Sequence, residues 1–380
     1  MRSERLANVI VVLLFAAAIA APALQEVTDF LPKVQVVDNR ELAPFPPLGT
    51  ELKTIIALPG RFQAWYADHM GLRGALVTAY RWLNDDLLRS PDKVVIGRDH
   101  WLYLRKGLLE DVETAPLIRD WCGRDEFTAR ELDRWVAVIT ANRDWLAKRG
   151  IDYLLVIPPN KLSVLPQHRP AWFRCRRGTT RLDQLESALR RRSGIELVDF
   201  RDVLRRSAQA GDPVWFRTDT HWSPRGVAAA YPSLMARIHA LLPAAGVIGS
   251  FDIGSRGTVL GDLGRMIDVD GLVPDVDWTA RPPAPRSHAV PTPFPDQADL
   301  YGRRSSARAI DDPSLPTALV FHDSFFDGAM DDFLAESFSR TVFVFYGRPE
   351  IERRLVSEDD PDIVIQEMVE RNLLHSFFHP

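Results

Sequence analysis

The sequence predicts an α/β fold in which a parallel β-sheet is flanked by helices. Short, nearly continuous apolar runs recur along the chain, as expected for strands buried on both faces. Between them lie longer segments whose apolar residues recur at helical spacing. The apolar runs are 151–157, 195–200, 317–321, 341–345 and 362–365. In such a sheet, ligands bind at the carboxyl ends of the strands.

The N-terminus predicts export from the cytosol. Arg2 and Arg5 precede an apolar run over 6–24, which has about the length that crosses a bilayer. Positive charge before the run favours a cytoplasmic N-terminus with the rest of the chain outside. We expect residues 1–26 to be a retained anchor. The alternative is a cleaved signal peptide, because Ala18-Ile19-Ala20 resembles a cleavage site.

After the anchor, residues 27–47 are polar and contain proline, which is typical of a linker, and 48–380 are expected to form the main folded domain. Residues 58–88 have the pattern of an amphipathic helix. The segment 97–104 predicts a hairpin or edge element that packs Trp101 and Tyr103 against the sheet.

Two further helices have clear end signals. Thr128 and Glu131 form a predicted capping box for a helix that ends at Gly150. A second helix runs from about Thr180 and ends near Gly194. Each precedes one of the apolar runs, as the alternation of helices and strands requires.

Residues 245–316 interrupt this alternation and predict an irregular insertion. The segment from Arg281 through Pro295 contains six prolines, and few of its residues suit a core. Before them stands Gly261-Asp262-Leu263-Gly264. These glycines indicate either a plain turn, which we favour, or a close approach of the backbone to a site.

Composition excludes some classes of function. Charged residues make up 26% of the 380 residues, and the net charge is -4, without a basic block of the kind that binds nucleic acid. Cys122 and Cys175 are the two cysteines. In an exported protein an isolated pair favours a disulfide, because two thiols cannot complete a zinc site.

Two short motifs supply the residues of a serine nucleophile and its base. The first is Thr218-Asp219-Thr220-His221-Trp222-Ser223-Pro224, and the second is His322-Asp323-Ser324-Phe325. A serine hydroxyl needs an imidazole to take its proton and a carboxylate to orient that imidazole. We predict these roles for Ser324, His221 and Asp219.

Both motifs are expected at the ends of secondary-structure elements. Ser324 follows the apolar run 317–321 and precedes a helix-like segment, 330–338, so the backbone amides of Ser324 and Phe325 are candidates to bind an oxyanion. Ser223 and Pro224 are the cap and first residue of another predicted helix. His322 is expected to pack at the strand end.

These motifs resemble the periplasmic alginate O-acetyltransferase family, whose fold is SGNH-hydrolase-like. The resemblance includes Gly97 to Tyr103 and Ile157-Pro158-Pro159-Asn160-Lys161, and it extends from about Asn39 to Leu374 with the motifs in the same order. In that family the Asp-x-His motif precedes the serine, which supports the roles of Asp219, His221 and Ser324. The chain departs from the family pattern at His322, where glycine is common.

The resemblance implies that the chain transfers acetyl groups to hydroxyls of an exported polysaccharide through an acyl-enzyme, and that it is located in the periplasm. A membrane-bound O-acyltransferase partner would supply the acetyl group. We predict neither a cofactor nor a bound metal. The predicted substrate contacts are Asn160, Lys161, Trp222 and Arg371, with the side chain of Asn160 as a candidate second oxyanion donor.

Three alternatives stay open. An acetylesterase would use the same residues, with water in place of the sugar. A noncatalytic polysaccharide-binding subunit would use exposed Trp222, Trp172 and Trp278 to stack on sugars. A metal-dependent hydrolase would bind its ion through Asp219, His221 and Asp323, and is the least favoured. The motifs do not specify the polymer.

Overall fold

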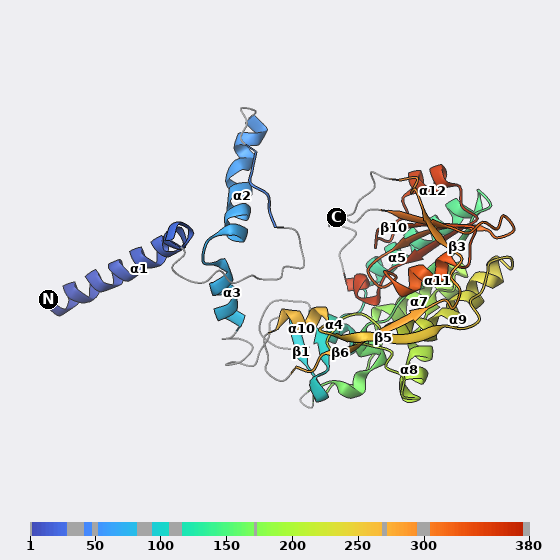
Figure 1. Ribbon diagram of the computed structural model, residues 1–380, viewed down its shortest axis with the longest axis horizontal. Helices are drawn as coiled ribbons and strands as arrows, with labels where there is room; N and C mark the ends of the chain where they lie inside the picture. Colours follow the sequence, from blue (N-terminus) through green and yellow to red (C-terminus); the bar gives the residue numbers. More distant parts are fainter. Residues whose placement is uncertain are drawn as a thin grey trace. The chain divides into compact units, whose positions relative to one another are not determined.

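The computed structural model describes eight ranges of the chain (Figure 1): 2–28, 42–47, 52–81, 93–105, 116–170, 173–267, 272–294 and 305–374. The chain separates into two compact units. One comprises residues 1–91 with 267–270, and the other comprises 92–266 with 271–380.

The first unit is helical. It contains α1 (Arg2–Thr28), α2 (Leu52–His69) and α3 (Arg73–Arg81). One helix of the described residues is long and apolar enough to cross a membrane: α1, through its window Val9–Glu26, which has a mean hydropathy of 2.1. The single helix expected over 58–88 is replaced by α2 and α3, and residues 82–88 lie outside the described ranges.

The second unit is built on a seven-stranded sheet with the order β4-β3-β11-β9-β10-β8-β7. The first five strands in this order are parallel, but β8 pairs antiparallel with β10 and with β7. The expected parallel sheet is therefore a mixed sheet. The strands are β3 (Asp152–Ile157), β4 (Val198–Asp199), β7 (His288–Val290), β8 (Ser306–Ala309), β9 (Thr317–His322), β10 (Arg340–Phe345) and β11 (Ile363–Glu367).

Helices cover both faces of this sheet (Figure 1). Successive side chains of a strand point to opposite faces, so Leu154 and Val156 pack into one core while Leu155 and Ile157 pack into another. The first face carries α8 (Arg201–Gln209), α9 (Pro224–Leu241) and α11 (Ala329–Ala335). The second carries α5 (Ala129–Ala147), α7 (Arg181–Ser193) and α12 (Arg353–Asp359).

The predicted helix ends are confirmed. Thr128 and Glu131 form a reciprocal capping box at the start of α5. Gly194 ends α7 in the left-handed conformation at φ 66°, which glycine adopts without steric cost. Ser223 caps α9 by accepting a hydrogen bond from the Gly226 amide.

The predicted insertion is not irregular, although its position is as expected. It contains a long antiparallel pair, β5 (Asp252–Val259) and β6 (Asp275–Arg281), with α10 (Asp262–Met266) between them. Its later part supplies β7 and β8 to the main sheet. Strands β5 and β7 escape an apolar-run criterion because most of their side chains are exposed, as at a sheet edge, and β8 escapes it because Ser306–Ala309 alternates polar residues with alanine.

A separate two-stranded sheet forms from β1 (Val94–Ile96) and β2 (Leu102–Leu104). The hairpin expected over 97–104 is thus real but does not pair with the main sheet. Tyr103 is buried and donates its hydroxyl to the carbonyl oxygen of Leu165 at 2.7 Å. The remaining short helices are η2 (Arg98–His100), α4 (Pro116–Trp121), α6 (Lys161–Val164), η4 (Pro166–His168) and η5 (Glu370–Leu374).

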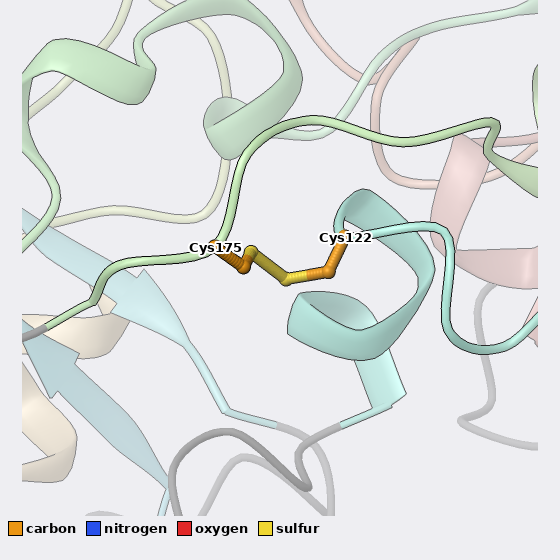
Figure 2. The surroundings of a disulfide bond; sticks show 2 residues. All are labelled: Cys122 and Cys175. Atoms are coloured by element: carbon orange, nitrogen blue, oxygen red, sulfur yellow. A yellow bond between two sulfur atoms is a disulfide. The ribbon is translucent and has the colours of Figure 1, made fainter.

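A disulfide joins Cys122, which follows α4, to Cys175 on an extended segment (Figure 2). The two cysteines are 53 positions apart, and their Cα atoms are separated by 5.9 Å. Gly178 donates its amide to the carbonyl oxygen of Trp121 beside this bond. Closing a loop of this length contributes about 4 kcal/mol in the chain-entropy model.

Candidate active site

Asp219, His221 and Ser324 form a continuous hydrogen-bonded chain. His221 Nε2 lies 2.9 Å from Ser324 Oγ, and His221 Nδ1 lies 2.7 Å from Asp219 Oδ1. We assign the proton to Nδ1, because it can then be donated to the carboxylate. Nε2 is left with a lone pair facing the serine hydroxyl, which is the arrangement required of a general base.

The Asp219 carboxylate is held in place by three donors. Oδ1 accepts from the ring and the backbone amide of His221, and Oδ2 accepts from the Asp262 amide at 2.9 Å. Burial opposes ionisation of Asp219, but the interactions with His221 and the Asp262 amide outweigh it and hold the pKa well below its usual range. Asp219 is therefore an anion throughout the neutral range.

The histidine loop, residues 217–223, connects to the hairpin of β5 and β6 through Asp275. The Asp275 carboxylate accepts from the Arg217 amide at 2.7 Å and from the Thr218 amide and hydroxyl at 2.8 and 2.6 Å. The Trp215 indole donates to the Thr220 carbonyl oxygen at 3.0 Å. These bonds satisfy the loop's backbone and fix its path.

Asp262 is a second carboxylate at this loop, and sequence reasoning did not assign it a role. It accepts from the Thr220 amide at 2.7 Å and from the Thr220 hydroxyl at 2.5 Å, and one of its oxygens lies 3.9 Å from His221 Nδ1. The sequence feature that could have identified Asp262 is the motif Gly261-Asp262-Leu263-Gly264. A Cβ on Gly261 would lie 2.5 Å from the Cβ of Asp219, so this glycine permits a close approach and is not merely part of a turn.

Ser324 projects from the nucleophile turn, residues 323–328, between β9 and α11. Asp323 anchors this turn. Its amide donates to Glu367 Oε2 at 2.7 Å, and its Oδ2 accepts from the Val369 amide at 2.8 Å and from Asn372 Nδ2 at 2.9 Å. Asp323 thus ties the serine to β11 and the segment that follows it, and it does not join Asp219 and His221 as a metal ligand.

The predicted oxyanion role of the Phe325 amide is wrong in this geometry. That amide donates to Asp323 Oδ1 at 2.9 Å, so it is already satisfied. The Ser324 amide, by contrast, has no hydrogen-bond acceptor among the described residues. A backbone N–H without a partner beside the nucleophile is the donor that an oxyanion requires.

Two predicted substrate contacts, Trp222 and Lys161, are buried and already hydrogen-bonded within the protein. Trp222 is 4% exposed and donates its indole N–H to the Phe325 carbonyl oxygen at 2.8 Å, which joins the histidine loop to the nucleophile turn. Lys161 is 5% exposed and donates to the carbonyl oxygens of Leu102 and Arg217 at 2.7 and 3.0 Å. Burial lowers the pKa of Lys161 to about 7.

Asn160 and Arg371 are placed where a substrate contact is possible. Both line a cavity that is also lined by Lys161 and Thr220. The Arg371 guanidinium lies 4.9 Å from the ring centroid of Phe325, next to the nucleophile. Within the described part of the chain, its side chain makes neither a hydrogen bond nor an ion pair.

The other aromatic and histidine residues have packing roles. His322 is buried, and its ring meets Phe343 and Phe345 edge-on, as expected for a residue at the end of a strand. Trp278 is half-buried under the guanidinium of Arg225 at 5.1 Å. Trp172 lies outside the described residues. A stacking surface formed by Trp222, Trp172 and Trp278 is therefore not supported, because Trp222 is not exposed.

The serine leaves a parallel strand of a sheet covered on both faces, and its histidine and aspartate come from a single earlier loop. This combination defines an SGNH-hydrolase-like α/β protein. The family model described as "SGNH hydrolase-like domain, acetyltransferase AlgX" matches residues 94–345, which is more than half of the chain. The chain belongs to this family.

Comparisons with individual proteins agree with this assignment. The protein named "Probable alginate O-acetylase AlgJ" from Pseudomonas aeruginosa is 31% identical over 188 residues, which cover 47% of this chain and 42% of that protein. Its namesake from Azotobacter vinelandii is 27% identical over 239 residues, or 60% and 53% of the two chains. The chain thus spans about half the length of these relatives.

Solved structures support the fold. The structure of PatB1 from Bacillus cereus matches with a TM-score of 0.51 at 13% identity, covering 74% of this chain and 97% of that chain. A DHHW family protein from Eubacterium siraeum matches with a TM-score of 0.50 at 11% identity, covering 75% and 93%. At these identities the likeness concerns the fold alone.

Proposed function

We propose that this protein transfers acetyl groups to hydroxyls of an exported polysaccharide through an acyl-enzyme on Ser324. The observation that carries the proposal is the hydrogen-bonded chain from Asp219 through His221 to Ser324 Oγ. Membership of a family described as an acetyltransferase supports acetyl as the group transferred.

In the first half-reaction, Ser324 Oγ attacks the carbonyl carbon of an acetyl ester while its proton passes to His221 Nε2. The tetrahedral intermediate collapses as the bond to the donor's alcohol oxygen breaks, and the imidazolium returns its proton to that oxygen. The product is acetyl-Ser324 with a neutral His221. Asp219 stabilises the imidazolium between these two events.

In the second half-reaction, His221 takes the proton of a sugar hydroxyl as that oxygen attacks the acetyl carbon. The bond to Ser324 Oγ then breaks, and the serine recovers a proton from the imidazolium. Water in place of the sugar would release acetate. Transfer therefore requires an acceptor site that favours the sugar over water.

We assign stabilisation of the oxyanion to the Ser324 amide, with Asn160 and Arg371 as the further donors. The Ser324 amide lacks an acceptor among the residues described, the other two residues line one cavity, and the Arg371 guanidinium lies 4.9 Å from the ring centroid of Phe325. A guanidinium stays charged at neutral pH even where burial lowers its pKa, so Arg371 would also favour an anionic group on the substrate.

The same proposal includes the cellular compartment of the protein and the source of its acetyl groups. The apolar window of α1 supports an anchored protein whose catalytic unit lies in the periplasm. Acetyl-CoA is cytosolic, so a membrane-bound O-acyltransferase partner would deliver the acetyl group. Alginate, for which the relatives are named, is the first acceptor to test.

The test is product analysis with the full chain purified in detergent. The protein is incubated with a chromogenic acetyl ester and with oligosaccharides of alginate or of a neutral glucan, and the sugars are weighed by mass spectrometry. We expect acetylated oligosaccharide in amounts that depend on the protein. Ser324→Ala should abolish the product, while Ser255→Ala, a serine change at an exposed position on β5, should not.

The outcomes separate the alternatives. Release of acetate without any acetylated sugar would replace the transferase with an esterase. Full acetylation by a folded Ser324→Ala protein would overturn the covalent mechanism. Binding of oligosaccharide with neither product would indicate a noncatalytic subunit.

A further inference from the structure

We propose that Asp262 is a positioning residue that fixes the protonation pattern of His221 by orienting the hydroxyl of Thr220. This inference rests on the proposed function, because it explains how the base of that reaction is kept in its working form. Asp262 would not touch the substrate. It would act through two neighbouring residues of the histidine loop.

The argument begins with the two contacts of His221 Nδ1. This nitrogen lies 2.7 Å from Asp219 Oδ1 and 3.2 Å from Thr220 Oγ1. A threonine hydroxyl can either donate or accept a hydrogen bond. If it donated to Nδ1, the ring proton would move to Nε2, and His221 could no longer accept the proton of Ser324.

Asp262 removes this ambiguity. Its Oδ2 lies 2.5 Å from Thr220 Oγ1, and a carboxylate can only accept. The hydroxyl proton must therefore point at Asp262, which leaves a lone pair of Thr220 Oγ1 toward Nδ1–H. Asp219 and Thr220 then both accept from Nδ1–H, and Nε2 stays unprotonated.

The backbone of Asp262 contributes a second restraint. Its amide donates to Asp219 Oδ2 at 2.9 Å, while its Oδ1 accepts from the amides of Thr220 and Leu263, each at 2.7 Å. One residue thus holds both neighbours of His221. Gly261 allows this approach, because any larger residue would collide with Asp219.

A divalent cation is the competing explanation, since Asp219, His221 and Asp262 bring ligand-type atoms within 4.8 Å of one another. However, all four carboxylate oxygens of Asp219 and Asp262 already accept N–H or O–H donors. A set of oxygens satisfied by donors suits a hydrogen-bond network better than an ion.

The test compares Asp262→Asn with a matched control. Asn carries its own donor group, so it can give a hydrogen bond to Thr220 Oγ1 and free the hydroxyl proton to reach His221 Nδ1. We expect kcat to fall on the order of 10- to 100-fold with KM unchanged, less than the roughly 10⁴-fold loss expected on replacing an orienting aspartate directly.

The pH profile should move as well. The charged groups around His221 are Asp219 and Asp262, with Lys161 and Arg371 interacting with both carboxylates. Removing one anion destabilises the imidazolium, so the midpoint of the profile should shift toward lower pH by about one unit. Loss of packing alone would not produce this shift.

The matched control is Asp275→Asn. Asp275 accepts from the amide and hydroxyl of Thr218 as Asp262 does from Thr220, but its hydrogen bonds within the described residues are to Arg217 and Thr218 and not to His221. This change should lower the melting temperature and leave the midpoint of the pH profile in place. Thr220→Val should be milder than Asp262→Asn, because it removes the acceptor without creating a competing donor.

The tautomer of the His221 imidazole can also be measured directly, without an activity assay. In full-length protein labelled with ¹⁵N-histidine, the nitrogen chemical shifts report which ring nitrogen carries the proton, and the His221→Ala spectrum assigns the signal. We expect protonated Nδ1 in the wild type and a substantial Nε2–H population in Asp262→Asn.

An unchanged tautomer and pH midpoint in folded Asp262→Asn would overturn the proposal even if the protein is an active transferase. Stoichiometric Zn²⁺ binding that Asp262→Asn abolishes would also overturn it, in favour of a cation site. Failure of the acetyl-transfer assay with the predicted tautomer change intact would instead remove the proposed function and leave the positioning role.

Discussion

The histidine loop and the nucleophile turn are both anchored by carboxylates, but their anchors come from different parts of the chain. The loop is held by Asp262 and Asp275, which lie in the insertion between α9 and β8. The turn is held by Asp323 itself, whose carboxylate accepts from Val369 and Asn372 after β11 and whose amide donates to Glu367 in β11. One half of the site depends on a peripheral hairpin, and the other half depends on the central sheet.

Because of this difference, we expect substitutions in the two halves to have different effects on the reaction rate and on stability. A strand end in the middle of a sheet is buried and surrounded by satisfied backbone groups, so one lost bond leaves others in place. The histidine loop has no strand of its own beyond the isolated pairing of Trp215 with Trp222. Its geometry depends on close contacts, and small changes there should affect the reaction more than the stability.

The largest expected effect comes from breaking the link between the halves. Ser324→Ala and His221→Ala should each reduce acyl transfer by about 10⁴- to 10⁶-fold, because each removes a member of one unit. The double variant should be hardly slower than either single variant. The measurement is kcat/KM with an acetyl ester, with circular dichroism to verify folding. Losses that multiply in the double variant would show that the two residues act separately.

The next effect is specific to the histidine loop. Gly261→Ala introduces a Cβ within 2.5 Å of Asp219 and of the Thr218 backbone, so the loop must shift. We expect a loss of about 10²-fold in kcat, because displacements of about 1 Å cost that much in an oriented site. The control is Gly249→Ala, whose added Cβ meets nothing within 4 Å. Equal rates for the two variants would contradict the close-approach role.

A smaller effect is expected on the sheet side. Asn372→Ala removes one of three donors to the Asp323 carboxylate and should lower the free energy of unfolding by about 2 kcal/mol. The rate should stay within about tenfold, because two backbone donors remain. Asn142→Ala removes a buried amide on α5, and it should cost similar stability with no change in kcat. A rate loss as large as that of Gly261→Ala would abolish the distinction between the two halves.

The smallest effect concerns the carboxyl group of Asp120, which lies outside the histidine loop and the nucleophile turn but lines the same cavity as Asn160 and Arg371. Burial raises the pKa of Asp120 to about 7, so the folded state binds its proton more tightly than the unfolded chain does. Its contribution to stability is complete below about pH 4 and is lost as the pH rises through about 7. Asp120→Asn should therefore flatten the fall in unfolding free energy between about pH 4 and about pH 7, measured by denaturant titration. An unchanged pH dependence would show that Asp120 is not the group responsible.

Much of the fold could be predicted, because strands such as β9 and β11 are apolar on both faces and their helices carry clear caps. The chain order of Asp219, His221 and Ser324 was likewise visible in short motifs. The structure brings these three together, as predicted, within hydrogen-bonding distance.

Supporting contacts were harder to predict because they join residues far apart in the chain. Nothing local indicates that Asp275 accepts from Thr218, or that Asn372 reaches Asp323. The burial of Trp222 and Lys161 could not be predicted, because each side chain can either bind a sugar or pack internally and only tertiary structure decides between these. Strand β7 was missed because it is a short, largely exposed edge strand, and β8 was missed because its residues, Ser306–Ala309, form no continuous apolar run.

The insertion has one part that supports the histidine loop and another part that adds strands to the main sheet. The boundary between these two parts is a suitable position for attaching a label. Both supporting carboxylates precede residue 276, whereas 283–285 are exposed and connect β6 to β7. The connection is tied down just afterwards, where the amides of Arg286 and Ser287 donate to the Glu336 carboxylate. A fluorophore or affinity tag placed at Ala284 would therefore report on the catalytic unit while leaving the hydrogen bonds around His221 and Ser324 untouched.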